Sequence, residues 1–403
     1  MRKAIKIKDL GEVITGNTPP RSNPELYGRH TPFIKATDIE ESSKFTYFPE
    51  EFYSEIGFQK YKKSLIRKGA SCVVTIGSVG KKMTMAHCDC FINQAMNAVV
   101  PNNNYDDEYV YYLLKNNIHK LKMLNSGTAS GRENISKSAF SNMEIEAILD
   151  KDKQIIIGKI LSAYDKLIEN NQKQIKLLEE AAQRLYKEWF VDLRFPGCEN
   201  TPIIDGVPEG WGKYRISEIG KVVTGKTPST EKEEYYGKEI PFVKIPDMYN
   251  GIYSIVTETS LTKEGADTQK SKYIPANSIM VSCIATVGLV NISVNVCQTN
   301  QQINTIILNQ QEDLYYLYFT MKRLKTLLEG VGSNGATMTN VNKTKFENLE
   351  ILYPIKELRK KYFCFCYPIF KKIYDLSMNN IFLSQARDCL LPKLMSGELE
   401  VQL

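Results

Sequence analysis

The sequence predicts an α+β protein with two similar α/β lobes in tandem, separated by two long antiparallel helices that form a coiled coil with pseudo-two-fold symmetry. Three observations lead to this prediction. A set of short motifs occurs twice, each copy contains short apolar runs punctuated by glycine, and each copy is followed by a long segment of helical periodicity. With the order lobe, helix, lobe, helix, antiparallel helices let the two apolar stripes bury each other.

The first observation is an internal duplication. Residues 7–38 match residues 216–247 at a constant offset, so that Gly16 falls on Gly225. The shared pattern is T-G-x-T-P, followed by Y-G and by P-F-[IV]-K-x-x-D. The match continues with small gaps, which indicates a tandem repeat of one domain. The predicted divisions are a first lobe at 1–150, a central spacer helix at 151–197, a second lobe at 198–354, and a C-terminal spacer helix and tail at 355–403.

Each lobe has the pattern of a mixed helix and sheet domain. Runs such as SCVVTIGSVG in the first lobe and SIMVSCIATVG in the second predict strands separated by glycine-containing turns. One helix per lobe is expected, at YVYYLLKNNIHKLKML and at DLYYLYFTMKRLKTLLEG.

The two spacer segments have helical periodicity. Apolar residues recur at steps of three and four in 152–190 and again in 355–391, which predicts a helical seam with coiled-coil character. We expect Pro196 to stop the first helix and Pro392 to close the second. An asparagine occupies the matching place in each seam, either buried, where it fixes register, or at the exposed edge. The predicted seam residues are Ile160, Tyr164, Leu167, Asn171, Ile369, Ile373, Leu376 and Asn380.

The stretch GKVVTGKT, residues 220–227, fits the phosphate-binding pattern G-x-x-x-x-G-K-[ST]. In such a loop the lysine and threonine begin a helix, but Pro228 follows Thr227 directly and disfavours a helix there. The first copy of the repeat has Asn17 where Lys226 stands. We therefore reject a nucleotide-binding loop and predict that the glycine and the Thr-Pro pair shape a turn, since glycine permits a positive φ and proline fixes φ.

Composition and charge place the chain among ordinary globular proteins. Its nine cysteines are scattered without CxxC pairs, and the N-terminus has no signal-peptide pattern, so we expect a reduced, cytoplasmic protein. No apolar run has the length of a membrane span. The net charge of +6 permits nucleic-acid binding but is too small to argue for it alone.

The search for catalytic or metal-binding residues finds no candidate constellation. The three histidines all lie in the first lobe and have no counterparts in the second. The HCDC run at 87–90 lacks the spacing of a zinc site, so we expect no metal. The methyltransferase pattern [DN]-P-P-[YF] is also missing, so no catalytic residue is predicted.

Polar loops stand at the same position in both lobes. SGTASGREN (126–134) and GSNGATMTN (332–340) are rich in residues whose side chains can hydrogen-bond base edges and phosphates. An ordinary solvated loop would have the same composition, and duplication copies unimportant loops too, so both interpretations stay open.

Several segments together resemble the specificity subunits of Type I restriction-modification systems. They are TGNTPP at 15–20, TGKTPS at 224–229, EAAQRLYKEWFVDLRFPG at 180–197, VPEGW at 207–211 and DCLLPKLMSGELEV at 388–401. The resemblance covers nearly the whole chain and includes its tandem layout.

The resemblance implies a non-catalytic DNA-recognition subunit. Each lobe would be a target-recognition domain that binds one half of a bipartite double-stranded DNA sequence. The helices would set the spacing and dock two methyltransferase (M) subunits, and restriction/translocase (R) subunits would complete the complex. S-adenosylmethionine, ATP and magnesium would belong to those partners, with no cofactor in this chain and no membrane association. The alternatives are a stand-alone DNA modification or restriction enzyme, and a coiled-coil adaptor that does not bind DNA.

The residues predicted to contact DNA come from the Thr-Pro turns, from nearby basic positions and from the two polar loops. They are Thr18, Arg21, Lys35, Lys81, Lys82, Ser130, Arg132, Asn134, Lys226, Thr227, Lys244, Ser333, Asn334, Thr337, Thr339 and Asn340. The two polar loops differ in sequence, with Arg132 opposite Met338, so the two half-sites are expected to differ.

Overall fold

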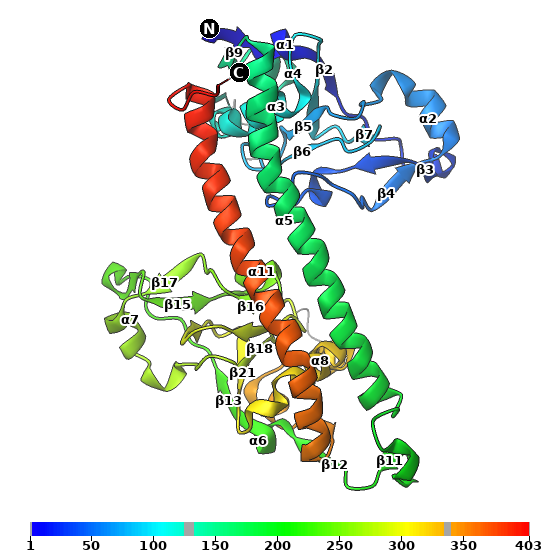
Figure 1. Ribbon diagram of the computed structural model, residues 1–403, viewed down its shortest axis with the longest axis vertical. Coiled ribbons are helices and arrows are strands. Elements are labelled where there is room, and N and C mark those ends of the chain that lie inside the picture. Colours follow the sequence, from blue (N-terminus) through cyan, green and yellow to red (C-terminus); the bar gives the residue numbers. More distant parts are fainter. Residues whose placement is uncertain (1, 125–132, 334–339, 403) are drawn as a thin grey trace. The chain divides into compact units, whose positions relative to one another are not determined.

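The computed structural model describes residues 2–124, 133–333 and 340–402 (Figure 1). The chain forms two compact units, and the boundary between them cuts through both long helices. Unit 1 comprises Met1–Gln172 and Asn379–Leu403, and unit 2 comprises Lys173–Met378. Each unit therefore contains one lobe together with one half of each long helix.

Lobe 1, in unit 1, is built on a four-stranded antiparallel sheet in the order β2-β8-β5-β6, with a three-stranded sheet in the order β4-β3-β7. A further pair, β1 with β9, joins the two ends of the lobe. Helix α3 is buried along most of its length because six of its residues are apolar or aromatic and enter the core: Tyr109, Val110, Tyr111, Tyr112, Leu113 and Leu114. The bounds are β1 Arg2–Lys6, β2 Gly11–Thr15, β3 Tyr27–Ile34, β4 Glu51–Tyr53, β5 Ser71–Val74, β6 Met83–Met85, β7 Phe91–Ile92, β8 Met96–Pro101, α3 Asp107–Asn117 and β9 Glu144–Ile148.

Lobe 2, in unit 2, repeats this plan. Its main sheet has the order β13-β21-β18-β19-β16, its second sheet the order β14-β17-β15-β20, and β12 pairs with β22. Thr224 lies opposite Asn304 in the β13–β21 ladder, as Thr15 lies opposite Asn97 in the β2–β8 ladder, so the two lobes share register as well as motifs. The bounds are β12 Gly212–Arg215, β13 Gly220–Thr224, β14 Tyr236–Gly237, β15 Ile240–Val243, β16 Tyr253–Ser254, β17 Thr259–Leu261, β18 Ile279–Ser282, β19 Val290–Ser293, β20 Gln298–Thr299, β21 Ile303–Leu308, α8 Leu314–Arg323, α9 Lys325–Ser333 and β22 Glu350–Tyr353.

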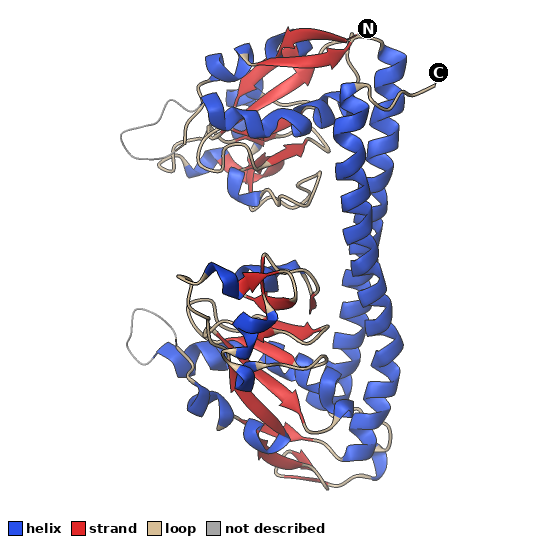
Figure 2. Cartoon of the chain, turned by 90° about the vertical axis from the view of Figure 1, so that its left-hand side faces the viewer, coloured by secondary structure: helices blue, strands red, loops and turns tan. Residues whose placement is uncertain are grey.

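The long helices are α5 (Lys151–Tyr186) and α11 (Lys356–Ser396). Within each unit they lie side by side (Figure 2). In unit 1, Asp165 pairs with Arg387, and the Asn171 amide donates to Asn380 Oδ1 at 2.9 Å, so residue numbers rise on one helix as they fall on the other. The helices are therefore antiparallel there. Asn171 is buried, which favours the register-fixing interpretation of this residue.

The predicted end of the second helix at Pro392 is wrong. The helix passes through Pro368 and Pro392 and ends at Ser396. Both prolines are exposed, whereas Leu391 and Leu394 beside the second one are buried in the core of lobe 1. Burial of these apolar side chains offsets the backbone hydrogen bond that a proline removes.

The predicted seam is wrong at Leu167, whose side chain is 51% exposed. The buried stripe instead passes through Leu161, Asp165 and Ile168. Counting apolar residues missed this face because Asp165, a charged residue, occupies one of its buried positions. Of the other predicted seam residues, Ile373 and Leu376 are buried, and four are partly exposed: Ile160, Tyr164, Ile369 and Asn380.

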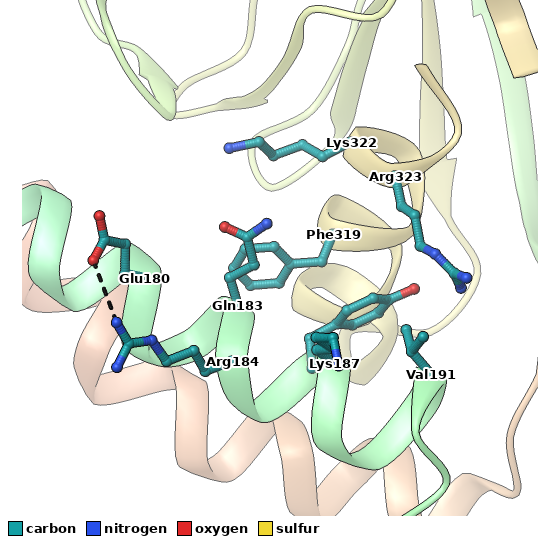
Figure 3. Close-up of a pocket in the computed structure, with 9 residues that line it drawn as sticks. Glu180, Gln183, Arg184, Lys187, Val191, Phe319, Lys322 and Arg323 are labelled. Carbon is teal, nitrogen blue, oxygen red and sulfur yellow. Dashed lines mark ion pairs between the residues drawn. The ribbon is translucent and has the colours of Figure 1, made fainter. Parts of the chain in front are cut away.

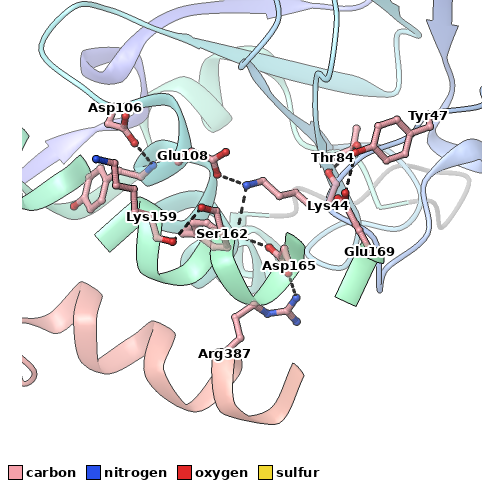
Figure 4. Close-up of polar contacts among 12 residues, drawn as sticks. Lys44, Tyr47, Thr84, Asp106, Glu108, Lys159, Ser162, Asp165, Glu169 and Arg387 are labelled. Atoms are coloured by element: carbon pink, nitrogen blue, oxygen red, sulfur yellow. Dashed lines mark hydrogen bonds and ion pairs between the residues drawn. The ribbon is translucent and has the colours of Figure 1, made fainter. Parts of the chain in front are cut away.

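A polar network fastens lobe 1 to the helices (Figure 4). The Tyr112 hydroxyl on α3 donates to Asp165 on α5, and Asp165 also pairs with Arg387 on α11. Burial alone would lower the pKa of Arg387, but the hydrogen bond to Asp388 and the charge of Asp165 raise it above its usual value. A second buried cation, Lys44, pairs with Glu108 on α3 and so fixes the segment between β3 and β4.

Unit 2 uses aromatic packing at the corresponding place. Tyr315 on α8 lies with its ring centre 4.2 Å from that of Phe370 on α11, and the Tyr362 hydroxyl donates to the carbonyl of Ala182 at 2.9 Å. Arg359 is also buried and pairs with Asp313 at the start of α8. Each unit therefore packs one lobe helix against the long helices and contains one buried arginine–aspartate pair, between α5 and α11 in unit 1 and between α11 and the start of α8 in unit 2.

Among residues 2–124, 133–333 and 340–402, no helix combines the length and apolar character needed to cross a membrane.

Candidate nucleic-acid interface

The T-G-x-T-P motif builds the same turn in both lobes. The Thr15 hydroxyl donates to Asn97 Oδ1 at 2.6 Å, and Thr224 donates to Asn304 Oδ1 at the same distance. A Cβ atom on Gly16 would lie 2.1 Å from the backbone oxygen of Asn93. The glycine is thus required by the close approach of two chain segments, and not by a positive φ as the turn prediction assumed.

The threonines predicted to contact DNA belong to this framework. Thr18 donates its hydroxyl to the Gln94 side chain, and Thr227 donates to Gln301 Oε1 at 2.7 Å. The segment that resembled a phosphate-binding loop is strand β13 followed by an irregular turn, with no helix at Lys226. The repeated threonines therefore hold the turn in shape, and their hydroxyls are engaged within the protein.

Tyrosines of the Y-G motif complete the framework. The Tyr27 hydroxyl donates to the carbonyl of Pro19 at 2.5 Å, and the Tyr236 hydroxyl donates to that of Pro228 at 2.9 Å. Burial raises the pKa of both phenols, so they stay protonated donors. The repeated residues thus specify a shared scaffold, which leaves DNA specificity to residues that differ between the lobes.

The basic residues near this turn differ in how closely they are paired with carboxylates of the protein, and so in how readily they could bind phosphate. Lys35 Nζ lies 3.0 Å from Glu51 Oε1 and also pairs with Glu50, and its side chain is only 18% exposed. Arg21 pairs with the same Glu51 at 2.7 Å, and its hydrogen bond, with the contribution of Lys35, holds the pKa of that carboxyl below its usual range. Lys244, the counterpart of Lys35, is 3.9 Å from Glu258 and about one-third exposed, so it is the freer phosphate-binding candidate.

Five other predicted residues lie at or near irregular segments. Asn134 pairs through its backbone with Ile76, and Asn340 pairs in the same way with Ile284. Lys81 is exposed and Lys82 is half-buried, both just before β6. Lys226 is exposed in its side chain, while its carbonyl accepts a hydrogen bond from the Gln269 amide at 2.7 Å.

The remaining predicted contacts belong to the polar loops. Ser333 is the last residue of α9, and only its backbone is described. Five predicted residues lie outside the described residues, so their assignment stays a prediction: Ser130, Arg132, Asn334, Thr337 and Thr339.

Sequence reasoning missed a basic pocket in unit 2 (Figure 3). It has a volume of about 650 Å³ and lies where the end of α5 meets α8. Four cationic side chains line it, with Glu180 3.9 Å from one of them, Arg184. The available signal was the segment EAAQRLYKEWF, whose Arg184 and Lys187 belong to this pocket, together with the Lys-Arg pair that ends α8. The cations are Arg184, Lys187, Lys322 and Arg323.

The HCDC run has the packing of a structural segment. His87 Nε2 lies 3.3 Å from Cys88 Sγ, and burial lowers the pKa of this histidine. Cys90 is buried in the core of lobe 1, where burial raises the pKa of its thiol. Across the part of the chain that the structure describes, no cluster of three or more histidine, cysteine, aspartate or glutamate residues could hold a metal ion.

Comparison with known proteins gives the same family for the whole chain. The model of the Type I restriction modification DNA specificity domain matches residues 3–180 and again 208–370. The specificity subunit of the Type I restriction enzyme HindI of Haemophilus influenzae is 32% identical over 72% of this chain and 77% of its own length. The MjaIX specificity subunit of Methanocaldococcus jannaschii is 27% identical over 98% of this chain and 93% of its own.

A solved structure supports the fold. The Type I restriction-modification S subunit of M. genitalium aligns with a TM-score of 0.59 at 15% identity, covering 98% of this chain and 96% of its own. The twofold match of the family model agrees with the duplication seen in the sequence and in the strand register. This chain belongs to the Type I restriction modification DNA specificity family, with two copies of the family's domain in tandem.

Proposed function

We propose that this chain is the DNA sequence-recognition subunit of a Type I restriction-modification complex and that each lobe binds one half of a bipartite target. The observation that carries this proposal is the pair of family domains on one polar framework, with different sequences in the corresponding polar segments of the two copies. A shared scaffold with differing polar segments suits two modules that each recognise a different DNA sequence.

The long helices act as the spacer between the two half-sites. Both helices contribute residues to both units, so a change in their length is expected to change the spacing between the two half-sites. Catalysis, S-adenosylmethionine, ATP and magnesium belong to the methyltransferase and restriction/translocase subunits. The absence of a methyltransferase motif in the sequence supports this division.

The division between base recognition and spacing can be tested by mapping methylated bases in cells. Replacing lobe 2 with that of a relative should change one half of the methylated motif and leave the other half unaltered. A map in which both halves change would contradict modular recognition.

A separate variant tests the spacer. Insertion of seven helical residues after Gln172, together with seven after Met378, keeps the helix faces in register and lengthens each helix by about 10 Å. At about 3.4 Å per base pair, the unread gap should widen by about three base pairs. Altered half-site bases with an unchanged gap would contradict the spacer role.

The basic pocket of unit 2 supports docking of a partner subunit. Lys187, which directly follows α5, and Arg323, at the end of α8, line the pocket (Figure 3). Lys187 is paired with Asp192 at 2.5 Å, and a partner carrying acidic side chains would complement the exposed Arg323 and compete with Asp192 for Lys187. Charge reversal by Lys187→Glu with Arg323→Glu should reduce co-purification of the methyltransferase subunit. The matched control is Lys360→Glu with Lys361→Glu on exposed positions of α11. Equal recovery from both double variants would reject the pocket as the docking surface.

The two alternatives predict different results with purified protein. A stand-alone modification enzyme would transfer methyl groups without partners, whereas an adaptor would leave the assembled complex unable to select a DNA sequence. We expect no methyl transfer by the chain alone and sequence-specific binding by the complex.

A further inference from the structure

The two lobes share a second exposed turn, at the tip of a hairpin in the main sheet. In lobe 1 it joins β5 to β6 and contains Thr75–Gly80, and in lobe 2 it joins β18 to β19 and contains Cys283–Gly288. We propose that these hairpin turns contact DNA directly, each in its own half-site. This inference rests on the proposed function and adds a reading element outside the two polar loops.

Both turns are rigidly supported. Val79 and Val287, near the end of each turn, are buried in the core of their lobe. In lobe 1 the Gly77 N–H donates to the carbonyl of Glu133 at 3.0 Å, and in lobe 2 the Val341 N–H donates to the carbonyl of Cys283 at 2.9 Å. These bonds connect each turn to the chain at the C-terminal end of a polar loop, Glu133 in lobe 1 and Val341 in lobe 2. A site fixed by its surroundings in this way loses little entropy when it binds.

The backbone at the tip takes the same unusual conformation in both lobes. Gly77 has φ of +91°, and Ala285, at the equivalent position, has φ of +63°. An alanine in this region is strained, because its Cβ crowds the backbone. The conformation is nevertheless kept where glycine is not present, which is typical of a constrained functional site. Space around Gly77 is open, since nothing lies within 4 Å of an added Cβ.

The tips present hydroxyl groups that differ between the lobes. Ser78 is exposed, and its counterpart Thr286 is half-buried and accepts a hydrogen bond from the Tyr249 hydroxyl at 3.4 Å. A serine or threonine hydroxyl can donate to or accept from a base edge, so both are suited to direct contact. The differing tips, Gly-Ser and Ala-Thr, agree with two different half-sites.

A lysine stands beside each turn. The side chain of Lys122 lies over Gly80, with its Cγ 3.2 Å from the site of an added Cβ, and Lys325 lies over Gly288 in the same way at 2.5 Å. Both lysines are exposed and come from the segments that follow α3 and α8. Both lysines also stand in matching short runs of sequence, Lys120-Leu121-Lys122 and Arg323-Leu324-Lys325. Each is placed to bind a phosphate beside the base contact of its own turn, and Lys325 also lies 4.0 Å from Glu329 on the same helix.

The substitution Gly77→Ala tests the proposal because Ala285 already shows that alanine is compatible with this turn. The variant adds one methyl group at the exposed tip, and Ser78→Ala removes one hydroxyl without altering the backbone. Each should weaken binding of the assembled complex to its own target by about five- to a hundredfold, the usual effect of one lost base contact. Base preference should change only in the half-site of lobe 1, and Thr286→Val should act only in the half-site of lobe 2.

The matched control is Gly206→Ala. Gly206 has φ of +77°, also has nothing within 4 Å of an added Cβ, and lies in the short β10–β11 hairpin (Ile203–Ile204 and Val207–Pro208) outside both main sheets. This variant should bind DNA as the unchanged protein does. Thermal unfolding of all variants verifies folding.

Two outcomes distinguish this inference from the function on which it rests. Sequence-specific binding by the unchanged complex, combined with normal affinity and base preference in both Gly77→Ala and Ser78→Ala, would overturn the role of the turn alone. If the unchanged complex showed no sequence-specific DNA binding, the proposed function itself would be refuted. Lys122→Ala should further reduce the dependence of log K on log salt concentration by about 0.9.

Discussion

The two lobes differ most in how they are attached to the long helices. In unit 1 a buried polar network of Tyr112, Asp165 and Arg387 accompanies the apolar contacts of α11 with the lobe 1 core. In unit 2 the attachment is largely aromatic, with Tyr315 packed on Phe370. The motif residues inside the lobes, by contrast, make equivalent hydrogen bonds. The comparison teaches that duplication preserved the geometry of the turns, while the attachment to the helices was rebuilt separately in each unit.

Removing the buried aspartates should have the largest effect, and the effect should differ between the units. Asp313→Ala leaves Arg359 buried, with the Pro354 carbonyl at 2.9 Å as a remaining partner, and should cost about 3–5 kcal/mol of unfolding free energy. Asp165→Ala should cost less, about 2–3 kcal/mol, because Arg387 keeps Asp388 at 2.9 Å. Urea unfolding of the two variants measures the difference, and equal losses would show that Asp388 contributes nothing.

The corrected helix face gives a matched pair of substitutions in unit 1. Ile168 is 5% exposed and Leu167 is 51% exposed, although they are neighbours on one helix. Ile168→Asp buries an unpaired carboxylate and should cost about 3 kcal/mol or more. Leu167→Asp should change stability by less than about 0.5 kcal/mol. If Leu167→Asp were the more damaging in denaturant titration, the helix faces would be assigned wrongly.

The shared framework should respond equally in both lobes. Gly16→Ala and Gly225→Ala each place a Cβ 2.1 Å from a backbone oxygen, of Asn93 and Asn300 respectively. We expect each to lower stability by about 1–3 kcal/mol, because the turn and the adjoining strand must move apart. Hydrogen exchange can follow the two lobes separately. A large effect in one lobe alone would break the equivalence of the two turns.

The smallest effects should come from the paired lysines, and here the lobes should differ again. Lys244→Ala should lower the salt dependence of DNA binding by about 0.9 in log K against log salt, if Lys244 binds one phosphate. Lys35→Ala should change it much less, because Lys35 is held by Glu50 and Glu51. DNA affinity measured at several salt concentrations gives the slope of log K against log salt for each variant. An equal change of this slope in both variants would show that Glu50 and Glu51 release Lys35 when DNA binds.

The sequence by itself determined the tandem organisation, the two long helices and the family. These features are local or periodic, so residues a few positions apart, or one repeat apart, carry the whole signal. The Gly16 and Thr18-Pro19 part of the repeated motif could also be assigned to a turn, because proline fixes φ and glycine permits conformations closed to other residues. The physical reason for the glycine was predicted wrongly. Glycine is needed at position 16 because a Cβ atom there would clash with the backbone of Asn93, which is far away along the chain.

Only the tertiary structure decided which face of each helix is buried and which polar residues are engaged. Asp165 lies in the buried stripe because Arg387, 222 residues later, compensates its charge, and no local pattern contains that partner. The sequence predicted that Thr18 and Lys35 contact DNA. In the fold the Thr18 hydroxyl is hydrogen-bonded to Gln94, and Lys35 forms an ion pair with Glu51. Burial and pairing depend on contacts between distant residues, so they follow from the three-dimensional arrangement and not from the order of residues along the chain.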